Sequence, residues 1–237
     1  LSPANRVMGF AAGRRSRRAR TVWDDAKNSR ERFMKYEWKK QEKDLYGAKA
    51  MPSLVTVPAQ NFILIRGKGN PNDAAFSDRV AALYAVAYAI KMGYKAAAVR
   101  NAAAEAMHDF AVYPLEGVWS QKAEGGLVKD MLEYAIMLRQ PDCISESEVD
   151  AALEKVKKKP NPFYTDIRFE SMQDGQCMQV LHTGAFDDEP ASLEKMARFA
   201  EEQGLRLDRS RHREIYLNNP HRVEAGKLKT ILRISLK

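Results

Sequence analysis

The sequence predicts an α+β fold made of two pseudo-symmetric strand-helix-strand-strand modules with antiparallel sheets and a shared cleft. Three observations lead to this prediction. The chain repeats itself weakly, and each copy holds an apolar strand, an amphipathic helix and two further strands in that order. Its 237 residues, 45% of them hydrophobic, can form the core of one large or two small domains. Its longest apolar run, residues 80–90, is shorter than the roughly 20 residues that a bilayer requires, so we expect no membrane span.

The first module covers about residues 50–144. Apolar side chains recur at spacings of three and four through residues 73–92, which predicts an amphipathic helix with Asp73 as its cap. The alanine-rich insertion at residues 95–109 is expected to be a loop or an extra helical turn. The β-branched and apolar stretches predict strands at residues 54–65, with a bulge or short hairpin at 58–61, and at residues 62–69, 113–119 and 136–139.

A linking helix at residues 145–160 is predicted between the modules, because its apolar side chains lie on one side and Pro160 ends the pattern. The second module covers about residues 161–237. Its helix, residues 188–203, has Pro190 in the first turn and Gly204 at its end. Asp188 and Glu189 lie at the positive end of this helix. The predicted strands are residues 177–184, 211–217 and 230–233.

The positive charge is concentrated near the N-terminus. The formal net charge is +8, and much of it comes from residues 1–33, which include the cluster RRSRRAR at residues 14–20. We expect residues 1–33 to be a disordered basic tail derived from read-through or vector sequence, with the folded protein covering residues 34–237. Nucleic-acid binding by the tail is the alternative. The nearly neutral remainder carries no recognisable DNA-binding motif, which argues against nucleic acid as a partner.

The number and spacing of the cysteines and histidines indicate which cellular compartment and which cofactors to expect. Cys143 and Cys177 form no CxxC motif, so we expect neither a disulfide framework nor a zinc site, and a reducing cytoplasm fits this composition. The four histidines have no HxxxH or HExxH spacing. We therefore predict no metal and no other cofactor.

The candidate site comes from matching the third strands of the two copies. This alignment pairs Glu116 with Glu214 and predicts that both carboxylates face the shared cleft. Alternation along the strand puts Ile215 against the helix and Glu214 on the opposite face. His212 and Tyr216 share the predicted Glu214 face, and Tyr113 and Tyr134 are further candidates for aromatic walls. Trp119 falls on the helix side, unless a bulge at Gly117 turns it to the other face.

A partly desolvated carboxylate beside aromatic rings attracts lipophilic or cationic small molecules. Burial also raises the pKa of a carboxyl group, which makes Glu214 a candidate general base. The simpler alternative is that these strand glutamates are ordinary surface residues and that His182 and His212 are structural.

Several motifs, taken in order, resemble those of stand-alone GyrI-like small-molecule-binding proteins. The resemblance covers most of the chain from Met34 onward. The motifs are MKYEWKKQEKDLY at residues 34–46, GKGNPN at 67–72, LY at 83–84, PLEGVW at 114–119, LRQPD at 138–142, QVLHTG at 179–184, EIYL at 214–217 and LKTILR at 228–233.

This resemblance implies the tandem SHS2/GyrI-like fold with a ligand cleft between the modules. Some family members open the strained cyclopropane of genotoxic natural products, and here Glu214 and Tyr216, with Trp119, would carry that role. Glu116 would form a second acidic wall, and Tyr113, Tyr134 and His212 would contribute to ligand binding. The chain departs from the usual family pattern at four places, namely Ser120, Tyr134, Arg213 and residues 185–186.

Three functions follow as hypotheses. The first is a cofactor-free detoxifying hydrolase with a glutamate as general base. The second is a non-catalytic protein that binds or sequesters lipophilic cations. The third is an interaction protein that inhibits a topoisomerase.

Overall fold

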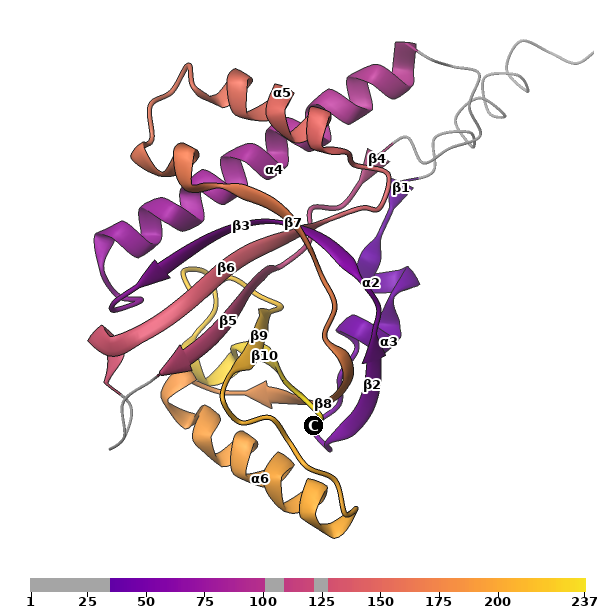
Figure 1. The fold of residues 1–237 in the computed structure, drawn as a ribbon, viewed down its shortest axis with the longest axis vertical. Coiled ribbons are helices and arrows are strands. Elements are labelled where there is room, and N and C mark those ends of the chain that lie inside the picture. Colours follow the sequence, from indigo (N-terminus) through magenta and orange to yellow (C-terminus); the bar gives the residue numbers. More distant parts are fainter. Residues whose placement is uncertain (1–34, 101–108, 122–127) are drawn as a thin grey trace, which may run out of the picture. The chain divides into compact units, whose positions relative to one another are not determined.

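The computed structural model describes residues 35–100, 109–121 and 128–237, and Figure 1 shows their arrangement. All of them belong to the compact unit Met34–Lys237. The predictions for the basic tail and for residues 101–108 of the insertion lie outside the described residues.

Eight antiparallel strands form the centre of this unit (Figure 1). The antiparallel pairing agrees with the prediction, but the strands of both modules form one continuous sheet and not a separate sheet for each module. The strand order of this sheet is β2-β8-β10-β9-β5-β6-β3-β7. The strands are β2 (Ser53–Val57), β3 (Gln60–Lys68), β5 (Leu115–Gln121), β6 (Leu132–Gln140), β7 (Arg168–Met172), β8 (Gly175–Thr183), β9 (His212–Tyr216) and β10 (Lys229–Ser235). A separate short parallel pair joins β1 (Lys35–Tyr36) to β4 (Asp109–Phe110).

The two predicted modules are β3-α4-β5-β6 and β8-α6-β9-β10, and they meet where β5 pairs with β9. The helices are α2 (Trp38–Gln41), α3 (Lys43–Tyr46), α4 (Ala74–Arg100), α5 (Glu146–Val156) and α6 (Glu189–Glu202). Short 3-10 turns occur at η1 (Lys129–Met131), η2 (Pro162–Asp166), η3 (Phe186–Asp188) and η4 (Ala225–Lys227). Within the described ranges, no helix combines the length and the apolar character needed to cross a bilayer.

The outer strands are exchanged between the modules. β2 precedes the first module in the chain but pairs with β8 of the second. β7 precedes the second module and pairs with β3 of the first. The bulge or short hairpin predicted at residues 58–61 is therefore wrong, because β2 and β3 are separate strands that pair with different partners and not with each other. Each module thus supplies an edge strand to the sheet of the other.

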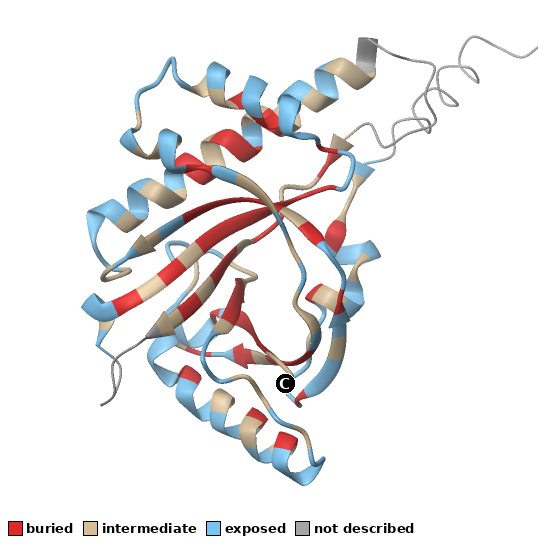
Figure 2. Ribbon diagram, viewed as in Figure 1, coloured by how far each residue is buried: buried red, intermediate tan, exposed pale blue. Residues whose placement is uncertain are grey.

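The two long helices cover one face of the sheet, which we call the helix face. Residues directly opposite one another in neighbouring strands point to the same face. One such row crosses the six inner strands of the sheet and consists of Ile65, Ile136, Gly117, Glu214, Leu232 and Val180. At one end of the row Ile65 and Ile136 pack with α4, and at the other end Leu232 and Val180 pack with α6. Figure 2 shows that burial is concentrated along the central strands and on the helix sides that face them.

Local signals explain the start of α5 and both ends of α6. Ser145 and Glu148 form a capping box at the start of α5, where the Ser145 amide donates to Glu148 Oε2 at 2.7 Å. Pro190 lies in the first turn of α6. Gly204 follows this helix with a φ of +66°, which favours glycine because that backbone conformation is strained for other residues.

The opposite face of the sheet is covered by the N-terminal segment that contains α2 and α3. Trp38 and Tyr46 from this segment pack with Tyr113, Ile215 and Ile231 in one buried cluster. Trp38 stacks on Tyr113 with 6.1 Å between ring centroids. Through Ile215 and Ile231, the cluster also brings the beginning of the described chain against strands of the second module.

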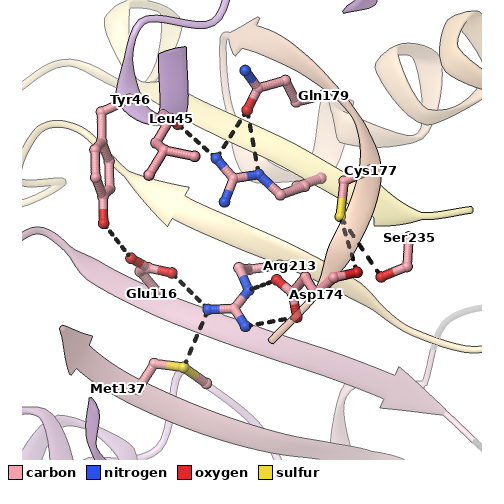
Figure 3. A network of polar contacts seen from close by, with 10 residues as sticks. Leu45, Tyr46, Glu116, Met137, Asp174, Cys177, Gln179, Arg213 and Ser235 are labelled. Atoms are coloured by element: carbon pink, nitrogen blue, oxygen red, sulfur yellow. Dashed lines mark hydrogen bonds and ion pairs between the residues drawn. The ribbon is translucent and has the colours of Figure 1, made fainter. Parts of the chain in front are cut away.

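A buried polar network lies on this second face (Figure 3). Arg213 donates to Glu116 Oε2 at 2.8 Å and to Asp174 Oδ1 at 3.0 Å, and the Tyr46 hydroxyl lies 3.3 Å from Glu116 Oε1. Arg233 donates to Gln179 and to the Leu45 carbonyl. Burial opposes the charged form of Arg213, but Glu116 and Asp174 raise the pKa of its guanidinium above the usual value. The ion pair between Arg213 and Glu116 is therefore a desolvated one in which each charge depends on the other.

Replacing Glu116 by Gln should lower the free energy of unfolding by about 3 kcal/mol, because it leaves the Arg213 charge incompletely paired in the interior. Urea denaturation followed by circular dichroism measures this change. Glu154→Gln is the matched control, because Glu154 forms an exposed ion pair with Lys157 and should cost less than about 1 kcal/mol. Equal stability of the two variants would contradict the assigned role of Glu116.

Candidate functional site

The candidate site lies on the helix face, at the junction of the two modules. Alternation along β9 brings His212, Glu214 and Tyr216 to this face. In the paired strand β5, Gly117 lies opposite Glu214 and Trp119 lies opposite His212. The junction thus brings together four of the predicted site residues, and we call these four, together with Glu189 described below, the Glu214 cluster.

Hydrogen bonds hold the Glu214 carboxylate at both oxygens. His212 Nε2 lies 2.8 Å from Oε1, and the Tyr216 hydroxyl donates to Oε2 at 2.6 Å. Trp119 Nε1 in turn donates to the Tyr216 hydroxyl at 3.0 Å. Burial and the charge of Glu214 raise the pKa of Tyr216 well above its usual value, so its hydroxyl remains a donor. The carboxylate therefore has a fixed position, with a hydrogen-bond partner at each oxygen.

Glu189 is the member of the cluster that the sequence analysis did not assign to the site. It lies in the first turn of α6 and is 6% exposed. Its carboxyl group, the Glu214 carboxyl group and a ring nitrogen of His212 lie within 4.8 Å of one another. Burial, together with the charge of Glu214 and a hydrogen bond to it, raises the pKa of Glu189 to about 9. Glu189 is therefore neutral at pH 7, and the site holds one proton between two carboxyl groups.

Two carboxyl groups and an imidazole are also side-chain types that bind divalent metals. In this cluster His212 Nε2 is already engaged by Glu214, and burial keeps Glu189 protonated. Hydrogen bonds and a shared proton account for the arrangement, and we assign no ion to it.

Aromatic rings flank the Glu214 cluster from both modules. Trp119 lies against Tyr134 with 5.2 Å between ring centroids, and Phe76 of α4 contacts both rings. On the other side, Phe186 meets Tyr216 edge-on at 5.7 Å and is 40% exposed. Trp119 and Tyr134 are each 5% exposed, so Phe186 is the ring of this group that solvent reaches most readily.

Two glycines make room for these rings. A Cβ atom on Gly117 would lie 2.5 Å from Trp119 Nε1 and 3.2 Å from the Tyr216 hydroxyl. A Cβ atom on Gly67 would lie 2.5 Å from the ring of Tyr134. In each case the aromatic ring lies directly against the backbone of the glycine. A side chain at the glycine position would collide with the ring, so only glycine fits there.

The predicted convergence of Glu116 and Glu214 is wrong. Glu116 pairs with Ile215 in the β5–β9 register, so its side chain points to the face opposite Glu214. The alignment of the two copies was one residue out of step at this strand, and in a β-strand such a slip transfers every side chain to the other face. The prediction that Ile215 packs on the helix, with Glu214, His212 and Tyr216 on the opposite face, is also wrong, because these three residues lie on the helix face. Ile215 packs beneath the N-terminal segment with Trp38, and this segment makes the second face of the sheet a buried apolar surface as well.

Tyr113 and Glu116 are thus separated from the other predicted site residues. Glu116 is 1% exposed and serves the buried network of Arg213. The Tyr113 hydroxyl donates to Glu42 at 2.5 Å, and the Arg139 guanidinium lies 4.8 Å from the centre of its ring. The prediction that Trp119 lies on the helix side was right, and Glu189 takes the place near Glu214 that had been expected for Glu116.

The chain matches the model of the GyrI-like small molecule binding domain over residues 50–237. Among solved structures it is similar to a conserved protein from Listeria innocua, with 35% identity and a TM-score of 0.78 over 86% of this chain and 100% of that one. It is also similar to a hydrolase from Listeria innocua, with 34% identity and a TM-score of 0.76 over the same shares. The C-terminal domain of EcmrR shares the fold at 11% identity, with a TM-score of 0.50 over 79% of this chain and 97% of that one.

A search of curated proteins produced no match. The chain belongs to the family of GyrI-like small-molecule-binding domains. The eight-stranded sheet with a helix over each half, which the structure shows, is the architecture that it shares with these relatives.

Replacing Gly117 by Ala should displace Trp119 and break its hydrogen bond to Tyr216, because the new methyl group has no space beside the indole. We expect a loss of about 1–3 kcal/mol in stability and a shift in tryptophan fluorescence. Chemical denaturation and an emission spectrum measure the two effects. Gly93→Ala is the control, since nothing lies within 4 Å of that position, and it should leave the spectrum unchanged. An unchanged spectrum for Gly117→Ala would contradict the close contact.

The raised pKa of Glu189 predicts a particular pH dependence of stability. The folded protein holds this proton more tightly than the unfolded chain, so the contribution of Glu189 declines as pH rises from about 4.5 towards about 9. Glu189→Gln removes the titrating group, so its stability relative to wild type should increase by more than about 1 kcal/mol across this range. Thermal unfolding at a series of pH values tests this.

Glu202→Gln is the control for this measurement, because Glu202 lies exposed at the end of the same helix. Its stability curve should run parallel to that of wild type. A parallel curve for Glu189→Gln as well would show that Glu189 is ionised in the folded protein.

Proposed function

We propose that the chain is a hydrolase that opens strained, cyclopropane-containing aromatic electrophiles, with Glu214 as the general base. The observation that carries this proposal is the Glu214 carboxylate itself, which is buried and bound at both oxygens beside aromatic rings from the two modules. The similarity to hydrolases from Listeria innocua, at 34% identity over their full length, supports a hydrolytic role.

A general base must hold a defined position and remain ionised near neutral pH. His212 and Tyr216 meet the first requirement because they fix the carboxylate from two sides. In this proposal His212 has its proton on Nε2, so that His212 and Tyr216 each donate to one oxygen of the carboxylate. In this proposal Glu214 takes a proton from a water molecule as that water attacks the strained ring.

The aromatic side chains have the role of positioning. Trp119 and Tyr134 present ring surface from the first module, and Tyr216 with Phe186 does so from the second. A planar electrophile held against these rings reaches the attacking water in a fixed orientation, which reduces the entropic part of the barrier. Glu214 and Tyr216 are thus the proposed catalytic residues, and Trp119, Tyr134 and His212 form the ligand site. Tyr113 and Glu116 are not part of the proposed site, because their side chains lie on the opposite face of the sheet, beneath the segment that contains α2 and α3.

The second candidate function is binding without turnover. An ionised carboxylate next to aromatic rings also attracts lipophilic cations, and Glu214 beside Tyr216 and Trp119 has this chemistry. The neutral state of Glu189 leaves the cluster with a single carboxylate charge, which suits a monovalent cation.

A spirocyclopropyl dienone serves as the test substrate, because ring opening by water converts it into a phenol with a different ultraviolet spectrum. Wild-type protein should produce the phenol, and Glu214→Gln should lower the turnover number by about 100-fold or more while still binding the phenol. Glu202→Gln should match wild type. If wild type gives no turnover but binds a lipophilic cation in a Glu214-dependent way, the second function is correct.

A further inference from the structure

We propose that the chain forms a two-fold symmetric dimer through α4, in which the exposed side of this helix packs against the same side of α4 in a second copy. This side of α4 is turned away from the sheet, whereas the Glu214 cluster lies on the sheet. The inference therefore concerns a separate surface and does not depend on the proposed reaction.

Helix α4 is apolar on more sides than its contacts within the chain explain. Residues 80–90, the longest apolar run of the sequence, all lie within this helix. One side of the run packs on the sheet and buries Leu83, Ala87 and Ile90. A second side packs against α5. A helical stretch that is apolar on all sides is normally buried on all sides, so the remaining side calls for a partner.

That remaining side presents apolar side chains to solvent. Tyr88 and Met92 are each 53% exposed, Ala81 is exposed and Ala85 is half-buried. These four residues, which we call the α4 stripe, follow one another at spacings of four, three and four residues. This is the heptad spacing with which two helices pack along one continuous seam. The stripe thus has the pattern of a helix–helix interface.

Charged residues continue the same spacing at both ends of the stripe. Asp78 comes three residues before Ala81, and Lys95 comes three residues after Met92. Asp78 is exposed, and the side chain of Lys95 is 50% exposed. Lys95 binds Asp109 at 3.2 Å, which uses one of the three donors of its ammonium group. The exposed side of α4 is therefore acidic at its beginning and basic at its end.

An antiparallel pair of these helices matches every residue of the seam with a complementary one. A two-fold axis at the centre of the stripe pairs Ala85 with Tyr88, Ala81 with Met92 and Asp78 with Lys95 of the second copy, and the reverse. Each small side chain thus meets a large one, and each acid meets a base. One axis satisfies all of these pairs at once.

Other arrangements lack this complementarity. A parallel pair would set Asp78 against Asp78 and Tyr88 against Tyr88, which brings like charges together and leaves no small residue opposite the ring. An unrelated partner would need only an apolar surface and would not require the two halves of the stripe to fit one another. In a two-fold interface each half packs on the other half, so the match between the halves favours a second copy of this chain.

Sedimentation velocity of the full chain at about 1–100 µM tests the proposal, because one helix from each copy makes a small interface and a reversible dimer. Wild type should form a species of twice the mass of the chain as concentration rises. Met92→Lys should weaken this association by about 100-fold or more, since it would bury a charge against Ala81. Met51→Lys is the matched control, because Met51 is 60% exposed outside α4, and it should associate like wild type.

A pair of opposite charges tests the antiparallel register. Ala81→Glu alone should weaken the dimer as Met92→Lys does. The double variant Ala81→Glu with Met92→Lys should regain at least about 10-fold of the lost affinity, because each new carboxylate would face a new ammonium group of the second copy. Circular dichroism verifies that each variant is folded.

Three results would overturn the proposal. The first is wild type that remains monomeric up to about 100 µM. The second is a dimer that neither single variant weakens, because its interface would then lie elsewhere. The third is a double variant that associates no better than the single variants, because the two positions would then not face one another.

Discussion

The register between β5 and β9 is the constraint on which the site depends. These two strands join the modules, and their pairing puts Gly117 directly opposite Glu214. Since Gly117 has no side chain, the space above it is filled by the indole of Trp119, which reaches the Tyr216 hydroxyl. A register shifted by one residue would instead set Glu116 on the helix face and leave Arg213 without its buried partner. The same pairing thus determines the chemistry of both faces.

Buried charges are neutralised in different ways on the two faces of the sheet. On the face covered by α2 and α3, Arg213 lies between two carboxylates, and the charges neutralise one another. On the helix face, Glu189 and Glu214 come together with no arginine or lysine among the groups that raise or lower the pKa of Glu189 most strongly, and a proton takes the place of a cation. A fully paired network of the first kind is inert, whereas a pair that holds one exchangeable proton is suited to acid–base chemistry.

Much of the fold could be predicted from the sequence, because the apolar periodicity of the two copies is a local property. The helices at α4 and α6 and the strands of both modules follow from it, and the exchange of β2 and β7 does not, because strand pairing depends on contacts between distant residues. The site was predicted in part. Glu214, Tyr216, His212 and Trp119 come together, but Glu116 does not, because weak similarity between the copies could not fix the alignment of one strand to the residue.

Glu189 was missed for a different reason. An acidic residue in the first turn of a helix is common, since it interacts favourably with the helix dipole, and the sequence offered no sign that this one is buried. Only the packing of α6 against β8 and β10 reveals that the carboxyl group of Glu189 faces that of Glu214. The sequence DDEP at residues 187–190, where three acidic residues precede a proline, is a signal that could have been noticed. Which of the three carboxyl groups is buried follows only from the folded structure.

The exchanged edge strands determine how the two halves of the chain would associate if the chain were cut between the modules. Because β2 completes the sheet of the second module and β7 completes that of the first, a chain cut within the α5 connection would yield two halves that each lack an outer strand and each carry one belonging to the other. Such halves are complementary fragments, held together by strand addition at two separate edges as well as by the central pairing of β5 with β9. The two modules are therefore interlocked, like the subunits of a strand-exchanged dimer that are joined in one chain.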